Sequence, residues 1–221
     1  MSGTPEAARP AVPAAPDVAR TVFGDALGDA ERYVAMLATD GVTRGLIGPR
    51  EVPRLWERHV LNSAAVAEAV PAGARVVDVG SGAGLPGIPL ALARTDVRLT
   101  LVEPMARRVE FLDQAVAALG APWTVVRGRA EEKSVRAAVG PVDVVTARAV
   151  AALPRLVSWC RGLLRPGAQL VALVGARALE ELPALVPELE AAGMRDIHPR
   201  AVGVGLGDAA TTVVVMTRGT R

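Results

Sequence analysis

The amino-acid sequence predicts an α/β protein with a doubly wound, mostly parallel sheet. Short apolar segments alternate with amphipathic helical segments from residue 75 onward, which is the pattern of successive strand–helix units. The predicted strands are almost continuously apolar, as expected where helices cover both faces of a parallel sheet. The 221 residues are enough for one such domain with a small extension.

The composition excludes several classes of protein. A hydrophobic content of 51% excludes a disordered chain. The longest charge-free apolar stretch, residues 79–93, contains four glycines and two prolines and is too short to span a bilayer. The chain starts without a signal-peptide pattern, and its single cysteine, Cys160, excludes an intrachain disulfide. We expect a cytoplasmic protein without membrane association or a metal, in which Cys160 fills space in the core.

The N-terminal third is expected to be helical and to precede the sheet. Residues 1–16 are rich in proline and alanine, which is typical of a disordered tail. Residues 17–70 form a predicted helical extension, with glycines weakening the first helix. The expected helices of this extension span residues 17–39 and 50–69.

Residues 71–221 are expected to form the sheet domain. The last strand is β-branched and is predicted to pair antiparallel with its predecessor, which makes the sheet mixed. Predicted strands span residues 75–80, 99–103, 123–127, 142–147, 169–174, 197–202 and 211–217. Predicted helices span residues 86–94, 105–119, 153–164 and 179–191, the last broken early by Pro183.

A glycine-rich loop between the first strand and its helix is the strongest functional signal. Glycines there allow a ligand to approach the backbone, and a helix N-terminus offers free N–H groups. Gly82-x-Gly84-x-x-Gly87 satisfies the dinucleotide fingerprint. Gly80-x-Gly82-x-Gly84, two residues after Asp78, instead resembles motif I of class I S-adenosylmethionine-dependent methyltransferases. The second interpretation is favoured, because Gly80 directly follows the strand and an acidic strand end suits the cationic amino group of methionine.

Further candidate ligand residues follow the next three strands. Glu103 can accept hydrogen bonds from both ribose hydroxyls of an adenosine. Ala130 and Glu131 would lie beside the adenine, where an amide and a carboxylate could recognise its edge. Arg148 occupies the edge used for substrate, and we expect it to orient a carboxylate, a phosphate or a base edge. The Asn/Asp-Pro-Pro-aromatic motif of many amino-methylating enzymes is absent there.

From about residue 20 to the end, the chain resembles the RsmG family, formerly called glucose-inhibited division protein B, in its actinobacterial form. Two departures occur: Asn62 stands where the family commonly has Asp, and Ala209-Ala210-Thr211 replaces an Arg-His pair. The resemblance rests on Arg58-His59-Val-Leu-Asn62-Ser63, Asp78-Val-Gly-Ser-Gly-Ala-Gly-Leu-Pro-Gly-Ile-Pro89, Arg107-Arg-Val-Glu-Phe-Leu112, Arg129-Ala-Glu-Glu132 and Thr146-Ala-Arg148.

The resemblance implies a Rossmann-like class I methyltransferase that methylates the N7 of one guanine in 16S ribosomal RNA. S-adenosylmethionine would be the donor and S-adenosylhomocysteine the product, with cofactor contacts at Gly80, Leu85, Ala130, Glu131 and Arg148. Guanine N7 carries a free lone pair. We therefore expect no general base and no catalytic residue beyond those that position the reactants.

An RNA substrate requires positive surface. Residues 127–165 hold eight basic and three acidic side chains, although codon usage could also produce a basic, solvated helix face. His59 lies on the apolar side of its helix, which favours a structural role over RNA contact, and Trp56, Trp123 and Trp159 are expected in the core. The RNA-contact candidates are Arg58, His59, Arg129, Arg136 and Arg155.

We expect a monomer whose partner is 16S ribosomal RNA or the small ribosomal subunit. Three alternatives stay open at this point. They are a small-molecule methyltransferase, an NAD-dependent oxidoreductase that uses the Gly82-x-Gly84-x-x-Gly87 spacing, and a non-catalytic RNA-binding module.

Overall fold

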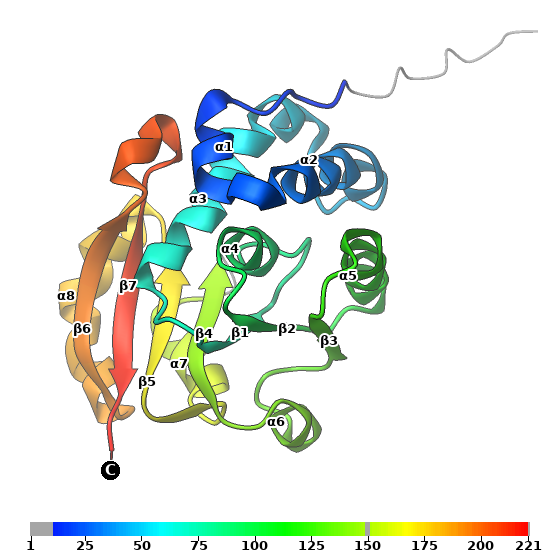
Figure 1. The fold of residues 1–221 in the computed structure, drawn as a ribbon. Helices are drawn as coiled ribbons and strands as arrows, with labels where there is room; N and C mark the ends of the chain where they lie inside the picture. The colour runs from blue at the N-terminus through cyan, green and yellow to red at the C-terminus, as the bar shows by residue number, and fades with distance from the viewer. Residues whose placement is uncertain (1–10, 149–150, 221) are drawn as a thin grey trace, which may run out of the picture.

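The protein folds around one seven-stranded mixed sheet (Figure 1). The computed structural model describes residues 11–148 and 151–220. Strand order is β3-β2-β1-β4-β5-β7-β6; the first five pair in parallel, and β7 runs antiparallel to both neighbours. The predicted fold class is thereby confirmed. The strands are β1 (Arg75–Val79), β2 (Arg98–Glu103), β3 (Thr124–Arg127), β4 (Val142–Arg148), β5 (Leu164–Leu173), β6 (Met194–Val202) and β7 (Thr211–Arg218).

Helices cover both faces of the sheet, and successive strand residues point into opposite layers. In β7, Val213 joins the core beneath α4 and α5, whereas Val214 joins the core beneath α7 and α8. This alternation is the period-two geometry of a strand. The helices are α1 (Asp17–Phe23), α2 (Leu27–Met36), α3 (Asn62–Ala64), α4 (Gly87–Ala93), α5 (Ala106–Leu119), α6 (Lys133–Val139), α7 (Leu153–Cys160) and α8 (Ala176–Ala191).

The N-terminal extension is helical, as predicted, but less regular. Gly24, at φ +50°, separates α1 from α2, which is the weakening that its sequence predicts. A π-helical turn at Leu37–Gly41 extends α2, and 3-10 and π-helical turns flank α3 between residues 49 and 69. Of the predicted tail, residues 1–10 lie outside the described chain. Residues 11–16 carry no helix or strand, and the carbonyl of Pro13 accepts a hydrogen bond from Trp56 Nε1 at 3.0 Å.

Three helix predictions need correction. The helix predicted over residues 153–164 ends at Cys160, because β5 already begins at Leu164. Pro183 does not break α8, because Pro183 and Pro187 both lie on its exposed face, where lost hydrogen bonds are solvated. Buried Leu182 and Leu189, seven residues apart, anchor the opposite face. Helix α6 was missed because it buries a single apolar side chain, Val135, so no periodic pattern marks it.

Candidate functional site

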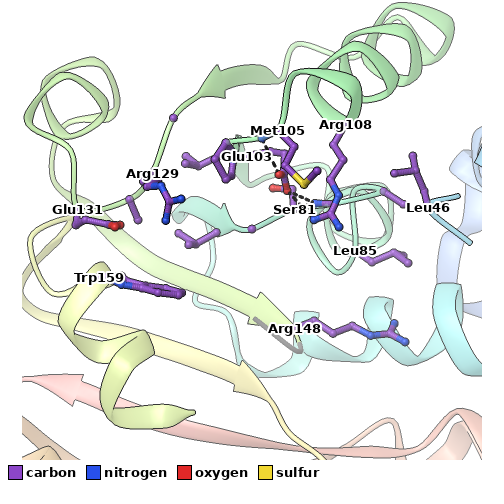
Figure 2. Close-up of a pocket in the computed structure, with 18 of the residues that line it drawn as sticks. Leu46, Ser81, Leu85, Glu103, Met105, Arg108, Arg129, Glu131, Arg148 and Trp159 are labelled. Carbon is purple, nitrogen blue, oxygen red and sulfur yellow. Dashed lines mark hydrogen bonds and ion pairs between the residues drawn. The ribbon is translucent and has the colours of Figure 1, made fainter. Parts of the chain in front are cut away.

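A cavity of about 480 Å³ opens at the carboxyl ends of the central parallel strands. This is the switch point of the sheet, where doubly wound folds bind ligands. The loops after β1, β2 and β3 supply most of its wall, Arg148 at the end of β4 and Trp159 add to it, and the N-terminal extension closes one side (Figure 2). Seven of the eight predicted cofactor residues line it: Gly80, Gly82, Leu85, Glu103, Ala130, Glu131 and Arg148.

The eighth residue, Gly84, lies behind the wall and serves packing. A Cβ on Gly84 would be 2.5 Å from Ile88 Cδ1 and 3.0 Å from Tyr33 Oη. Gly87 is also turned away from the cavity, because its Cβ would be 2.8 Å from Leu101 Cδ2. Two glycines of the dinucleotide fingerprint are therefore needed for close packing, Gly84 against Ile88 and Tyr33 and Gly87 against β1 and β2, and only Gly82 faces the cavity.

Asp78 acts inside the protein and does not line the cavity. Its Oδ1 accepts a hydrogen bond from Thr146 Oγ1 at 3.0 Å, and its Oδ2 accepts one from the Gly87 amide at 3.3 Å. Burial raises the pKa of the Asp78 carboxyl to about 6, and these hydrogen bonds partly oppose the shift. Asp78 thus ties β1 to β4 and to the start of α4, and so fixes both ends of the glycine loop.

Glu103 holds the glycine loop from the neighbouring strand. Its side chain is 1% exposed, and its two oxygens accept hydrogen bonds from the amides of Gly82 and Met105, both at 3.0 Å. Arg108 Nη1 lies 3.6 Å from Glu103 Oε2. Each carboxylate oxygen accepts about two hydrogen bonds, so both retain capacity for a hydroxyl in the cavity. This geometry suits the ribose role that its sequence position predicts.

The N-terminal extension supports the same loop through a residue that the sequence argument missed. Tyr33, the only tyrosine, is fully buried on α2 and donates a hydrogen bond from Oη to the Ala83 carbonyl at 2.6 Å. Burial raises the pKa of Tyr33, so the hydroxyl stays a donor at neutral pH. The sequence signal that could have identified Tyr33 is that it is the single tyrosine and lies on an apolar helix face. Leu46 and Ile47, from the following loop, also line the cavity.

Trp159 corrects one prediction, because it lines the cavity rather than filling the core. It lies at the edge of the buried stripe of α7, between Leu156 and Cys160, and is only partly buried. Figure 2 shows its ring beside Glu131 and below Arg129. The guanidinium carbon of Arg155 lies 5.0 Å from the ring centroid, within cation–π range. Cys160 is fully buried, as predicted, and burial raises the pKa of its thiol.

Arg148 extends from the end of β4 to the helical segment that contains Arg58, His59 and Ser63 (Figure 2). Its Nη1 donates to Ser63 Oγ at 3.1 Å, and its Nη2 donates to the Arg58 carbonyl at 3.2 Å. His59 Nδ1 lies 3.0 Å from Arg148 Nη2, and His59 Nε2 lies 2.9 Å from Glu51 Oε2. Both ring nitrogens of His59 therefore have protein partners, as a structural histidine requires.

A second cavity, of about 450 Å³, adjoins the first and shares Arg148 with it. Its polar groups include Arg58, Asn62 and Thr211, and its floor is apolar. Asn62, the departure from the family pattern, donates a hydrogen bond to the Ala209 carbonyl at 3.3 Å. This bond joins the two segments in which the sequence departs from the family. The apolar floor is formed by Ala147, Leu153, Leu156, Ala172, Leu173 and Val174.

The five predicted RNA-contact residues lie in three places, and His59 lines the first cavity. Arg129 lines the first cavity and Arg155 covers Trp159 in its wall, so both lie at the candidate site. Arg58 lines the second cavity and is exposed. Arg136 is elsewhere: it packs against Gly162 after α7, where a Cβ would be 2.8 Å from its Cδ.

Within residues 11–148 and 151–220, no group of three or more His, Cys, Asp or Glu side chains is placed to hold a metal ion. Within the same ranges, no helix has the length and hydropathy needed to cross a membrane.

The sheet order, the glycine loop and the cavity define the class: this is the fold of class I S-adenosylmethionine-dependent methyltransferases. A methyltransferase from Aquifex aeolicus superimposes with a TM-score of 0.55 at 18% identity, covering 79% of this chain and 97% of its own. TYW2 from M. jannaschii, solved in complex with AdoMet, gives a TM-score of 0.52 at 18% identity, covering 72% and 74%.

Sequence comparison identifies the family. The model of the GidB family, described as rRNA small subunit methyltransferase G, matches residues 26–203, and the chain belongs to this family. A protein of Mycolicibacterium gilvum named ribosomal RNA small subunit methyltransferase G is 53% identical over 204 residues, 92% of this chain and 90% of that protein. A protein of the same name from Streptomyces avermitilis is 55% identical, covering 92% and 85%. The predicted family resemblance is confirmed.

Proposed function

We propose that the protein transfers the methyl group of S-adenosylmethionine to the N7 of a guanine in 16S ribosomal RNA. The observation that carries the proposal is the cavity at the carboxyl ends of β1 and β2, where the Gly82 amide donates a hydrogen bond to Glu103. The chain that forms this cavity belongs to a family of ribosomal RNA methyltransferases. The names of the relatives support methylation of small-subunit ribosomal RNA. The choice of guanine N7 rests on the family resemblance and on the chemistry below.

The chain's own residues fit an S-adenosylmethionine ligand. Glu103 keeps acceptor capacity on both oxygens for the ribose hydroxyls, and Gly80 and Gly82 offer backbone without side-chain bulk. The loop at Ala130 and Glu131 forms the opposite wall with Trp159, which suits a planar adenine. When bound, the cofactor supplies a methyl group on a sulfonium, which is an electrophile that needs no activation by the protein.

Attack by guanine N7 requires no general base. Guanine N7 presents a lone pair and loses no proton before it attacks the methyl carbon. Positive charge then moves from the sulfonium to the methylated base, so the protein must align the two reactants. Buried Asp78 and Glu103 are both engaged in holding the glycine loop. This task positions the donor and leaves proton transfer out of the reaction.

Basic side chains around the cavity supply the RNA surface in this proposal. Arg129 and Arg155 lie at the first cavity, and Arg58 lies at the second. Neutralising Arg129, Arg136 and Arg155 together should flatten the salt dependence of RNA binding, because each lost phosphate contact reduces counterion release. Isothermal titration with S-adenosylhomocysteine would measure separately any change in cofactor affinity, because Arg129 also lines the first cavity.

Ligand binding and product mapping test the proposal. S-adenosylhomocysteine should raise the melting temperature of the protein, and NAD should leave it unchanged, because a ligand stabilises only the folded state that binds it. Stabilisation by NAD alone would refute the cofactor assignment. In a strain that lacks the gene, 16S RNA should lack one N7-methylguanine, and complementation should restore it. Restored methylation at any other atom would refute the N7 assignment.

A further inference from the structure

Glu51, His59 and Arg148 form a continuous chain of contacts that joins the N-terminal extension to the end of β4. Glu51 Oε2 lies 2.9 Å from His59 Nε2, and His59 Nδ1 lies 3.0 Å from Arg148 Nη2. The His59 side chain is 13% exposed and that of Glu51 is 31% exposed. Glu51 is not among the cofactor-binding or RNA-contact residues predicted from the sequence.

The partners determine which nitrogen of His59 carries the proton. An arginine guanidinium has donors only, so Nδ1 must accept from Arg148. An ionised carboxylate has acceptors only, so Nε2 must carry the hydrogen that is donated to Glu51. Burial lowers the pKa of His59, and the hydrogen bond from His59 lowers the pKa of Glu51. A neutral, Nε2-protonated ring beside an ionised carboxylate is therefore consistent with the surroundings of both groups.

The charged groups near this chain favour the same state. Arg58 Nη1 lies 3.5 Å from Glu51 Oε1, and Arg54 also acts on Glu51 as a positive charge. On the His59 side, the nearby cations are Arg148 and Arg58, and both oppose protonation of the ring. Glu51 itself favours the protonated ring, but burial and the two arginines outweigh it, and the pKa of His59 is lowered.

All four terminal N–H groups of Arg148 have partners in the segment from Arg58 to Ser63. Nη1 faces Ser63 Oγ at 3.1 Å and the His59 carbonyl at 3.5 Å, while Nη2 faces the Arg58 carbonyl at 3.2 Å and His59 Nδ1. The arginine therefore cannot present a two-pronged fork to a ligand without breaking these bonds. Arg148 lines both cavities. It can offer a ligand in either cavity its Nε–H, the face of its guanidinium and its positive charge.

We propose that Glu51 and His59 are positioning residues that hold Arg148 at the wall between the two cavities. Glu51 fixes the tautomer of His59, and that tautomer supplies the one side-chain nitrogen that accepts from Arg148. This assignment deepens the proposed function, on which it rests, because it names the residues that prepare the arginine between the cofactor and the methyl acceptor. Without an acceptor at His59, Nη2 would lose a partner and Arg148 could rotate out of the wall.

Nitrogen NMR tests the tautomer directly. The chain has two histidines, His59 and the exposed His198, so a protein labelled with nitrogen-15 in histidine gives a simple spectrum. The variant His198→Gln assigns the remaining signals to His59. At pH 7.5 we expect a neutral ring protonated at Nε2 and, in Glu51→Ala, a changed Nε2 signal, because the acceptor of its hydrogen is lost. A ring protonated at Nδ1, or an unchanged Nε2 signal in Glu51→Ala, would overturn the proposal.

Two substitutions of His59 separate positioning from mere structural support. His59→Asn places an amide oxygen near Nδ1 and keeps an acceptor for Arg148; His59→Gln places an amide nitrogen near Nε2 and keeps only the contact with Glu51. We expect His59→Gln to weaken S-adenosylhomocysteine binding about tenfold, as misplacement of a site residue does. His59→Asn should weaken it by less than about threefold on the same scale. Equal losses, or the reverse order, would overturn the proposal.

The controls keep this proposal distinct from the proposed function. His198→Gln, on the exposed side of β6, should bind S-adenosylhomocysteine like the unaltered protein. Melting temperatures of all variants show whether any loss of affinity reflects unfolding. If 16S RNA is not methylated while the tautomer and the difference between the two His59 variants are as expected, the RNA substrate is wrong and the positioning chain stands.

Discussion

Replacing Tyr33 with phenylalanine tests how the N-terminal extension supports the cofactor cavity. The substitution removes one hydroxyl from a fully buried side chain and leaves the ring in place. The Ala83 carbonyl then loses a hydrogen bond of 2.6 Å in the middle of the glycine loop. Removing one partner of a buried hydrogen bond costs about 1–3 kcal/mol, because the remaining group is left unsatisfied.

This magnitude can be measured in two ways. For a chain of this size, 1 kcal/mol lowers the melting temperature by about 2–4 °C, so Tyr33→Phe should melt several degrees below the unaltered protein. Affinity for S-adenosylhomocysteine should fall as well, since Ala83 lines the cavity. The matched control is Trp123→Phe, which changes a partly buried aromatic ring away from the loop. An unchanged melting temperature and affinity in Tyr33→Phe would refute the supporting role.

Three further predictions concern the loop itself. Glu103→Gln should weaken S-adenosylhomocysteine binding by about tenfold or more, because an amide group cannot accept from two backbone amides and two hydroxyls as a carboxylate does. Titration calorimetry measures the affinity, and an unchanged affinity would exclude the ribose role of Glu103. Gly87→Ala should destabilise the fold by about 1–3 kcal/mol in urea unfolding, because its Cβ would be 2.8 Å from Leu101 Cδ2 and 2.9 Å from Asp78 Cβ. The pKa of Asp78 is raised to about 6 in the folded state, so this group contributes stability at acidic pH that is lost as the pH rises through about 6. Stability measured from pH 5 to 7 should therefore decline less in Asp78→Asn, and an equal decline would contradict the assignment.

Local patterns were sufficient to predict the fold class and most of the residues that line the first cavity. The glycine loop that follows β1, and Glu103 at the end of β2, could be placed together from the sequence because the carboxyl ends of parallel strands share one edge of a sheet. Seven predicted residues lie in one cavity for this reason. The periodic pattern also located α5, which ends at the left-handed Gly120.

Features that depend on a short segment or on tertiary contacts could not be predicted in the same way. Helix α6 buries one apolar residue and leaves no periodic trace, and α8 continues through Pro183 because that residue faces solvent. Trp159 sits at the border of its buried stripe, so whether it packs in the core or lines a cavity depends on what lies opposite. For a side chain at the edge of a helix's apolar stripe, the neighbouring elements decide whether it is buried, and the residue spacing does not.

By itself, the sequence determined the class I fold, the family and most of the residues that line the first cavity, because strand periodicity and glycine spacing are local properties. Only the tertiary structure decided how those residues are held. Tyr33 reaches Ala83 across 50 positions, and Arg148 reaches His59 across 89. From its position, Asp78 was expected to face the amino group of the ligand. Its carboxylate instead accepts hydrogen bonds from Thr146 and Gly87. The physical reason is that a buried polar group must find its partner among whatever the fold brings within hydrogen-bond distance.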